Sequence, residues 1–300
     1  MPDPLRVGII GGGWIARVHV PAIDAAPGVE LVAACDTDIE RAEAIAGPQG
    51  AKAYAHWEEM LEHEHLDALW VCPPPLFHRG PVEVALAAGV HVYLEKPIAR
   101  NLEDADAIVE AAAASSAICA VGYQWHASEL LDDSKALLEG QQIGLVVGRN
   151  FGAVAGRPWF MDPVQGGGQI LERGSHQIDP QRALDGEIAE VEASGGGVRL
   201  SQTETPSGIE DVITLVFHFA DGGIGSAHLA WSLTGTSRGA DVALQRGEPM
   251  DRSIARFLDA VATGDASKIA CNPEDARKTL AVALACERAL ASGSRAAVAG

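Results

Sequence analysis

Short apolar runs alternate with segments of helical periodicity through the first 121 residues. The apolar runs are too short for typical globular helices and predict buried β-strands. These predicted strands cover residues 5–10, 29–35, 52–54, 68–72, 90–94 and 118–121. The predicted helices between them cover residues 14–18, 39–46, 56–64, 77–88 and 102–114. Strands that alternate with helices indicate an α/β, doubly wound parallel sheet that gathers ligands at the carboxyl ends of its strands.

The pattern changes after Gly122. Further strands are predicted at residues 145–154, 189–194, 212–219 and 225–231, and helices at 169–184, 254–262 and 274–291. Asp221-Gly222-Gly223 predicts a turn that joins two of these strands as an antiparallel hairpin. Pro180 is expected to kink or restart the helix that contains it. The second half of the chain is therefore predicted to be α+β, with a mainly antiparallel sheet.

Three glycines separate the first strand from the first helix. Gly11-x-Gly13-x-x-Ala16 matches the G-x-G-x-x-G/A pattern of dinucleotide-binding turns in the required strand–turn–helix context. Gly11 permits the tight turn, Gly13 lets a pyrophosphate approach the backbone, and Ala16 lets the helix pack closely on the sheet. The helix start at Trp14 and Ile15 would direct its backbone N–H groups at the phosphate. A glycine-rich turn without a ligand is the alternative.

Asp36 ends the second strand, a little over twenty residues after the glycines. A carboxylate at this position accepts hydrogen bonds from the adenosine ribose, and it would repel a 2′-phosphate. The sequence therefore predicts NAD as the cofactor, with NADP possible because Arg41 follows five residues later. The alternative for Asp36 is a cap on the next helix, a role that Thr37 or Asp38 could also fill.

Proline, charged or polar residues also follow three further predicted strands. Pro73-Pro74, Glu95-Lys96 and Tyr123-Gln124 each stand just after a strand. Because parallel strands bring their carboxyl ends to one edge, we expect these segments to meet beside the glycine turn.

Lys96 is the first candidate for chemistry. A lysine at this rim could act as an acid or base, or donate a hydrogen bond to a substrate oxygen, and Pro97 would restrict its backbone to extended conformations. A surface salt bridge at a strand end is the competing interpretation.

A second candidate site follows the glycine run 166–168. Glu172 and His176 are four residues apart and would share one face of a helix, which Asp179 continues. An acid one turn before a histidine can orient the imidazole and raise its basicity, and oxidation of a hydroxyl requires such a base. A solvated ion pair is one alternative, and half a metal site is another. No further ligand pair has suitable spacing, so we predict no metal.

Several other side chains are weaker candidates. His78 begins a helix after the proline run and either faces the cofactor or lies on the surface. Trp125, His126, Trp159 and Gln169 could line a polar-aromatic pocket, although core packing is the simpler interpretation of the tryptophans.

Composition narrows the class of protein. The net charge of −19 argues against nucleic acid or an anionic membrane as a partner. The five cysteines are widely separated, mostly within apolar runs, and predict buried thiols in a reducing, cytoplasmic location. We expect neither a leader peptide nor a membrane span.

The glycine turn, Glu95-Lys96-Pro97 and the later glycine-run-to-histidine helix, in this order, resemble the Gfo/Idh/MocA oxidoreductases, the family of glucose–fructose oxidoreductase and inositol dehydrogenase. The resemblance implies a Rossmann domain, which we assign to residues 1–123, and an α+β substrate-binding and oligomerisation domain over residues 124–300. It implies an open sheet in the second domain that forms homodimers or homotetramers. It also implies hydride transfer between NAD(P) and a secondary hydroxyl or ketone of a sugar, sugar derivative or inositol.

The resemblance also suggests individual roles. Lys96 would contact substrate and nicotinamide, and His176 would be the acid/base, supported by Glu172. The cofactor site would consist of Gly11, Gly13, Trp14, Ile15, Ala16, Asp36, Cys72, Pro73, His78, Glu95, Lys96 and Gln124. The substrate site would consist of Lys96, His126, Trp159, Gln169 and His176.

The chain departs from the family pattern in four places. Glu172 replaces the usual Asp, Cys72-Pro73-Pro74 replaces Thr-Pro-Asn, and Gln124-Trp125-His126 replaces a motif with Asn and Arg. The segment 234–250 looks short. These departures leave the substrate open. Two other functions are alternatives to the dehydrogenase: a family-like glycosidase or lyase that recycles its bound NAD, and a non-catalytic NAD(P)-binding regulator.

Overall fold

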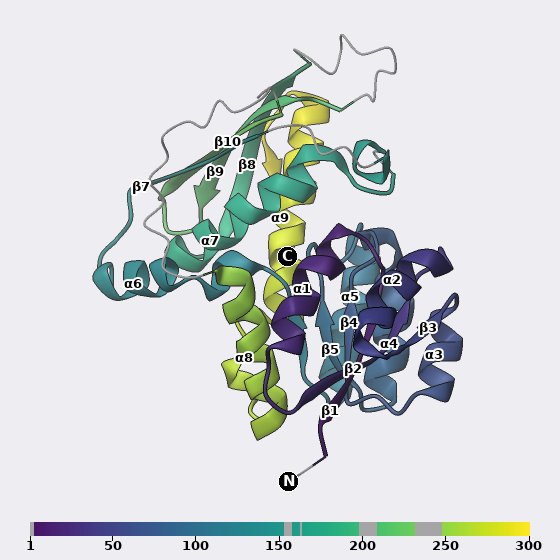
Figure 1. Cartoon of the computed structure of the whole chain (residues 1–300). Coiled ribbons are helices and arrows are strands. Elements are labelled where there is room, and N and C mark those ends of the chain that lie inside the picture. Colours follow the sequence, from purple (N-terminus) through teal and green to yellow (C-terminus); the bar gives the residue numbers. More distant parts are fainter. Residues whose placement is uncertain (1–2, 153–157, 163, 198–208, 232–247) are drawn as a thin grey trace. The chain divides into compact units, whose positions relative to one another are not determined.

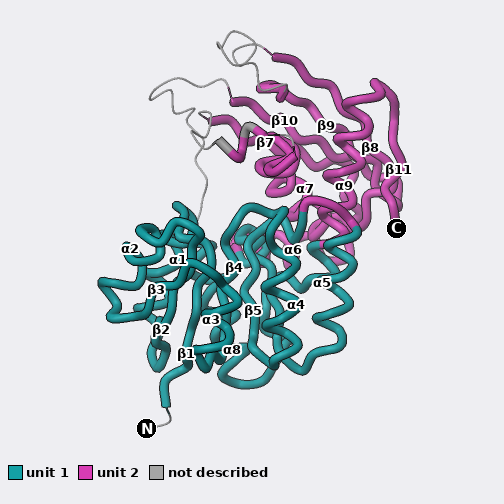
Figure 2. Tube along the Cα trace, turned by 90° about the vertical axis from the view of Figure 1, so that its right-hand side faces the viewer, with its two compact units in different colours: residues 1–99, 103–127, 248–276 teal, residues 100–102, 128–247, 277–300 magenta. Residues whose placement is uncertain are grey.

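The computed structural model describes the chain except residues 1–2, 153–157, 163, 198–208 and 232–247 (Figure 1). It divides into two compact units. Unit 1 comprises residues 1–99, 103–127 and 248–276, and unit 2 comprises residues 100–102, 128–247 and 277–300 (Figure 2). This division differs from the expected boundary at residue 123, because a C-terminal segment returns to unit 1. None of the described helices is long and apolar enough to cross a membrane.

Unit 1 contains the predicted parallel sheet. Its strands are β1 (Leu5–Ile10), β2 (Val29–Cys35), β3 (Lys52–Tyr54), β4 (Ala68–Val71), β5 (His91–Leu94) and β6 (Cys119–Val121), in the order β3-β2-β1-β4-β5-β6. All neighbouring strands are parallel. Ile10 pairs with Cys35 and Val71, and Leu94 pairs with Val71 and Val121. The last residues of five strands therefore form one row, and the segments after them start from a common edge.

The helices of this region follow the predicted order, with shifted ends. They are α1 (Trp14–Asp24), α2 (Ile39–Gln49), α3 (Trp57–His63), α4 (Arg79–Ala87) and α5 (Leu102–Ala114). The helix expected at residues 77–88 begins instead as a 3₁₀ turn over Pro75–Phe77, which precedes α4. Pro75 suits this start because a first-turn N–H has no intrahelical partner. A second 3₁₀ turn, Gln124–Ala127, follows β6.

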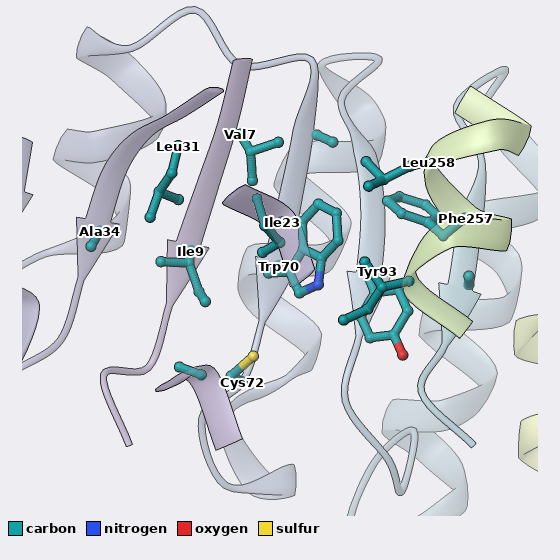
Figure 3. Packing of buried hydrophobic residues seen from close by; sticks show 14 of the residues in the cluster. Val7, Ile9, Ile23, Leu31, Ala34, Trp70, Cys72, Tyr93, Phe257 and Leu258 are labelled. Atoms are coloured by element: carbon teal, nitrogen blue, oxygen red, sulfur yellow. The ribbon is translucent and has the colours of Figure 1, made fainter. Parts of the chain in front are cut away.

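Helix α8 (Pro249–Thr263) belongs to unit 1, although the sequence analysis assigned it to the second domain. Its Phe257 ring lies 5.2 Å from Trp70 and 5.6 Å from Tyr93, both edge-to-face. Trp70 and Tyr93 stack on each other at 5.4 Å (Figure 3). The amphipathic pattern of residues 254–262 predicts a helix but does not indicate which sheet its apolar face covers.

Unit 2 contains a second sheet in the order β11-β8-β9-β10-β7. The strands are β7 (Leu145–Phe151), β8 (Ile188–Gly196), β9 (Val212–Phe219), β10 (Ile224–Ala230) and β11 (Ala296–Ala297). Among the described strands of this second sheet, only β7 and β10 pair in parallel, so the sheet is mainly antiparallel. The antiparallel pairing of β9 with β10 confirms the predicted hairpin. The remaining helices are α6 (Glu129–Leu137), α7 (Ser175–Asp185) and α9 (Pro273–Ser292), of which α9 begins in unit 1 and continues in unit 2.

Helix α7 packs on one face of this sheet through two glutamines. Gln181 Nε2 donates to the Ser226 carbonyl at 3.0 Å. A Cβ at Gly148 would lie 2.6 Å from the Gln177 amide oxygen, so the absence of a side chain in β7 allows the close approach. The helix does not restart at Pro180, because α7 continues through this proline to Asp185, and a kink at Pro180 stays a prediction.

Candidate functional site

The glycine turn after β1 is shaped by its neighbours. Gly11 has a φ of +90°, and a Cβ there would lie 2.7 Å from the Pro73 nitrogen. A Cβ at Gly12 would lie 2.9 Å from the Arg41 carbonyl oxygen. Within the described parts of the chain, no atom comes within 4 Å of the Cβ position at Gly13. Gly11 and Gly12 thus allow the turn to pack, and Gly13 leaves the space that a bound pyrophosphate requires.

Helix α1 begins directly at this space, at Trp14. The N-terminus of a helix favours an anion, because the first backbone N–H groups point out of it and the helix dipole is positive there. Ala16 is fully buried, Ile15 is partly buried, and the Trp14 side chain is 59% exposed. The residues present therefore fit the pyrophosphate of a dinucleotide.

Asp36 holds the glycine turn from the second strand. Its Oδ2 accepts the Gly12 N–H at 2.7 Å, and its Oδ1 accepts the Asp38 N–H at 2.9 Å. Asp38 occupies the N-cap position of α2, so the helix-cap alternative for Asp36 is wrong. Each carboxylate oxygen has a second lone pair, which leaves Asp36 able to accept from ribose hydroxyls as well. Arg41 Nε lies 3.1 Å from Asp38 Oδ2, which ties this arginine to a neighbouring carboxylate.

The segment after β4 is fixed by a buried histidine. His78 Nε2 lies 2.9 Å from the Pro73 carbonyl oxygen, and Nδ1 lies 3.1 Å from the Ile98 carbonyl oxygen. The ring is fully buried, so the surface interpretation of His78 is wrong. Burial lowers the pKa of His78, against the smaller opposing effect of the carbonyl oxygens. His78 connects the segment before α4 with the segment after Lys96, and a direct contact with the cofactor stays a prediction.

Cys72 lies beside Pro73 and is also buried. Its N–H donates to the Ile10 carbonyl at 2.8 Å, which continues the β1–β4 pairing. Burial and, to a smaller extent, the Glu95 carboxylate raise the pKa of the Cys72 thiol well above its ordinary value. Cys72 is therefore a neutral thiol at the strand edge.

Glu95 and Lys96 follow β5. The Glu95 side chain is 6% exposed; its Oε2 accepts the Lys96 N–H at 3.0 Å, and its Oε1 lies 3.0 Å from His19 Nε2. Burial alone would raise the pKa of Glu95, but the close contact with His19, with the charge of Lys96 and the Lys96 N–H, holds this pKa below its ordinary value. Lys96 itself is partly buried, and the Lys96–Pro97 peptide bond is cis.

The end of β6 completes this edge. The Gly122 N–H donates to the Leu94 carbonyl at 2.8 Å, so β6 stays paired with β5 up to Tyr123 and Gln124. His126 lies in the following 3₁₀ turn, with its side chain 16% exposed and Nδ1 3.8 Å from Asp275 Oδ2. Unit 1 thus brings together the glycine turn, Asp36, Pro73, Glu95-Lys96 and Tyr123-Gln124 along one sheet edge, as the strand pattern predicts.

The second candidate segment lies in unit 2 and is not a simple α-helix. Residues Ile170–Gly174 form a π-helical turn, in which the Ser175 N–H bonds to the Ile170 carbonyl. Ser175 Oγ donates to the Leu171 carbonyl at 2.6 Å. The α-helical spacing expected between Glu172 and His176 therefore begins only at Ser175. Both side chains are partly buried, and π-helical turns are frequent at functional sites.

The glycines before this turn pack against their own chain. A Cβ at Gly166 would lie 2.6 Å from the Trp159 carbonyl oxygen, and one at Gly167 would meet the Leu171 side chain. Gly167 and Gly168 have φ values of +68° and +69°. The packing of the loop on itself therefore accounts for the glycines at these positions.

Trp159 and Gln169 have packing contacts within unit 2. The Trp159 ring lies 4.8 Å from that of Phe160, which belongs to a small buried cluster with Ile209 and Trp231. Gln169 is buried and donates from Nε2 to the Glu210 carbonyl at 3.3 Å. These contacts agree with the packing interpretation of Trp159, and a substrate contact of either side chain stays a prediction.

Arg173 and His19 were missed by the sequence analysis. The Arg173 guanidinium lies 5.6 Å from the centre of the Trp231 ring, and its Nη1 donates to Asn150 Oδ1 at 3.4 Å. Burial lowers the pKa of Arg173, against the charge of Glu172. The sequence could have indicated His19, because the spacing of residues 16, 19 and 23 places it on the buried face of α1 with Ala16 and Ile23. A polar residue on an apolar stripe requires a buried partner.

Comparison with known proteins agrees with this geometry. Residues 5–123 match the model of the oxidoreductase family with an NAD-binding Rossmann fold, and residues 134–248 match that of the GFO/IDH/MocA C-terminal domain. The chain belongs to the Gfo/Idh/MocA family of oxidoreductases. The expected family, fold class, enzyme class and NAD(P) cofactor are confirmed. When bound, NAD(P) accepts or donates the hydride.

Similar proteins within this family include sugar and cyclitol enzymes. A 1,5-anhydro-D-fructose reductase from Ensifer adhaerens is 30% identical over 83% of this chain and 76% of its own length. A myo-inositol 2-dehydrogenase from Thermotoga maritima is 26% identical over 74% of this chain and 67% of its own length. The crystal structure of GenD2 from gentamicin A biosynthesis, in complex with NAD, superposes with a TM-score of 0.87. That superposition covers 100% of this chain and 98% of GenD2 at 21% identity, and it supports the fold. The segment 234–250, expected to be short for the family, falls mostly outside the described residues.

Proposed function

We propose that this Gfo/Idh/MocA protein transfers a hydride between a nicotinamide cofactor and a secondary hydroxyl or ketone of a sugar, sugar derivative or inositol. The observation that carries the proposal is the position of Lys96, two residues past the end of β5, on the sheet edge that also holds the glycine turn. The names of two relatives, an anhydrofructose reductase and an inositol dehydrogenase, support this substrate class.

The proposed chemistry divides between two side chains. In the oxidative direction the Lys96 ammonium donates a hydrogen bond to the substrate hydroxyl and orients its carbon. His176 accepts the hydroxyl proton as the C–H hydride leaves, and Glu172 supports the imidazole. In the reductive direction His176 returns the proton to the ketone oxygen. A positioned acid/base of this kind contributes roughly 10²- to 10⁴-fold to the rate.

The remaining predicted site residues have more passive roles in this proposal. Gly11, Gly13, Trp14, Ile15 and Ala16 hold the pyrophosphate by backbone approach and by the helix start. Cys72, Pro73, Glu95, Gln124 and, through the Pro73 carbonyl, His78 shape the edge on which the nicotinamide lies. His126, Trp159 and Gln169 bind the polyol hydroxyls.

We further propose that the cofactor is NAD rather than NADP. The Asp36 carboxylate lies where the 2′-phosphate of NADP would bind, and the like charges would repel each other. Arg41 is the nearest cation along the chain, and its ion pair with Asp38 reduces its availability for a phosphate.

Self-association through the sheet of unit 2 is also proposed. Leu145, Val147 and Phe151 of β7 are 65%, 62% and 50% exposed, and Ile224 of β10, which pairs with Leu145, is 44% exposed. Paired residues project to the same side of a sheet, so these four side chains lie on one face, here called the β7–β10 face, which also carries the exposed Arg149. Exposed apolar side chains on a sheet face of this kind support a homodimer or homotetramer.

A cytoplasmic location is proposed from the cysteines. Cys35, Cys72, Cys119, Cys271 and Cys286 are all buried free thiols. Free thiols persist in reducing compartments, whereas secreted proteins tend to pair them.

A substrate screen tests the proposed activity. The purified protein is incubated with NAD or NADP and a panel of polyols and aldoses, and with NADH and the corresponding ketoses, while nicotinamide absorbance is followed. The proposal predicts reduction of NAD by at least one cyclic polyol or sugar. Product release without accumulation of NADH would instead indicate an NAD-recycling glycosidase or lyase. Cofactor binding without turnover of any substrate would indicate a regulator.

A further inference from the structure

We propose that His19 and Glu95 form a buried pair that positions Lys96 for hydride transfer, with Glu95 in direct contact with the lysine backbone and His19 acting through Glu95. This inference rests on the function proposed above. It concerns positioning residues and assigns neither side chain a contact with the substrate.

The path from His19 to Lys96 is short and continuous. His19 Nε2 lies 3.0 Å from Glu95 Oε1, and the other oxygen of the same carboxylate accepts the Lys96 backbone N–H at 3.0 Å. The His19 side chain is 0% exposed and that of Glu95 is 6% exposed. The two carboxylate oxygens of Glu95 therefore contact different groups. Oε1 lies against His19 in the core of unit 1, and Oε2 accepts the backbone N–H of Lys96, the residue proposed to bind substrate.

The surroundings of the pair restrict its movement. The His19 ring lies edge-on to Tyr93 at 5.4 Å, and the Tyr93 hydroxyl lies 3.0 Å from Ser253 Oγ of α8. A Cβ at Gly122 would lie 3.2 Å from Glu95 Oε1, so the backbone after β6 closes the other side. The carboxylate is therefore held between α1, β5 and the end of β6.

Stability alone does not explain a buried charge at this position. Desolvation of a buried ion pair can exceed its Coulombic gain, and apolar side chains of similar size often give equal or greater stability. The neighbouring core offers such packing: Trp70, Tyr93 and Phe257 contact one another (Figure 3), and Tyr93 also contacts the His19 ring. A buried carboxylate that bonds to the backbone of a reactive residue instead resembles the supporting groups that fix catalytic geometry.

The chain provides a matched control on the same strand. His91 begins β5, whereas Glu95 follows its end, and the Nδ1 of His91 accepts the Ile118 N–H at 2.9 Å. His91 therefore makes a structural hydrogen bond in the same sheet, at the end opposite the glycine turn. Substitution at His91 perturbs the fold without touching Lys96.

The experiment compares Glu95→Gln, His19→Gln and the control His91→Gln in the full-length protein. Gln is chosen because it retains polar atoms, so that both test variants are expected to fold. For the substrate found in the screen, we expect kcat to fall roughly 10- to 100-fold in both test variants, as for a small displacement of a reacting group. In His19→Gln, which lies outside the proposed cofactor site, KM for NAD and the dissociation constant of NADH should change little. In His91→Gln, kcat should stay near the wild-type value whatever the change in melting temperature.

A second measurement does not depend on turnover. Limited acetylation followed by peptide mass spectrometry gives the reactivity of Lys96 relative to Lys52, whose side chain is 69% exposed. The proposal predicts a severalfold change of this ratio in Glu95→Gln and His19→Gln, and none in His91→Gln. An unchanged ratio in both test variants, or the same change in the control, would overturn the positioning role. If the two test variants show the predicted change of this ratio but the wild-type protein oxidises no polyol, the proposed substrate class is contradicted and the positioning role stays supported.

Discussion

Oδ2 of Asp36 accepts the backbone N–H of Gly12 at 2.7 Å, which links the end of β2 to the glycine turn after β1. The same carboxylate accepts the Asp38 N–H through Oδ1 at 2.9 Å. One side chain therefore fixes the shape of the pyrophosphate turn and presents negative charge where the adenosine ribose is proposed to lie.

Two substitutions separate these roles of Asp36. Asp36→Asn retains an oxygen that can accept the Gly12 N–H but removes the charge, whereas Asp36→Ala removes both. We expect both variants to lose affinity for NAD more than for NADP, because repulsion of the 2′-phosphate disappears. Asp36→Ala should also lower stability by about 1 kcal/mol through the lost hydrogen bond. Dissociation constants from titration calorimetry test this account, and an equal effect on NAD and NADP would remove the argument for NAD.

The contacts of the buried Glu64 carboxylate predict that the free energy of unfolding depends on pH. Its Oε1 accepts from Lys52 Nζ at 2.8 Å and from Tyr54 Oη at 2.6 Å, and Arg6 Nη2 lies 3.4 Å from Oε2. Burial raises the pKa of Glu64, but these partners together hold it below the ordinary value of 4.5.

A carboxyl group whose pKa is lower in the folded state stabilises the protein above its unfolded-state pKa and loses this effect as pH falls through the folded-state value. Glu64→Gln should therefore lower the free energy of unfolding by about 1–3 kcal/mol near neutral pH, less if solvent screens the exposed Lys52. The difference from wild type should shrink below about pH 4.5. Denaturant melts at several pH values measure this difference, and one that stays constant with pH would contradict the ionised role of Glu64.

The packing of α8 in unit 1 predicts that its buried aromatic side chain contributes to the stability of this unit. Phe257→Ala removes a fully buried ring that contacts Trp70 and Tyr93, and it should cost about 3–5 kcal/mol of stability. Because the affected unit holds the glycine turn, saturating NAD should restore part of the loss in melting temperature. Differential scanning fluorimetry with and without NAD tests this. A loss below about 1 kcal/mol would show that α8 contributes little to this core.

The β7–β10 face gives a prediction about assembly. Val147→Lys places a charge among the exposed apolar side chains of this face and should shift the protein toward the monomer in light scattering. Leu137→Lys is the matched control, since Leu137 on α6 is 82% exposed and lies outside the β7–β10 face. A mass that is unchanged by Val147→Lys, or lowered equally by both substitutions, would contradict association through this face.

The sequence predicts the part of the site that local patterns determine. Four strands of unit 1, β1, β2, β5 and β6, are followed directly by a glycine or a charged residue, and parallel pairing then brings Asp36 and Lys96 to one edge. Two features depend on tertiary packing instead. The apolar stripe of α8 predicts a helix but does not indicate which sheet the helix packs on. The i, i+4 spacing of Glu172 and His176 does not reveal the π-helical turn between them. His19 could have been found, because its position between Ala16 and Ile23 on the buried face of α1 requires a polar partner.

Transfer of an isotopic label tests the central claim most directly. The substrate found in the screen is prepared with deuterium on its carbinol carbon and incubated with NAD and wild-type protein, Lys96→Ala or His176→Ala. With the wild type, mass spectrometry should find the deuterium in NADH. Each variant should transfer the label roughly 10²-fold or more slowly while its dissociation constant for NAD stays near that of the wild type. Product formed without deuterium in the nicotinamide, or label transferred at the wild-type rate by both variants, would contradict hydride transfer assisted by Lys96 and His176.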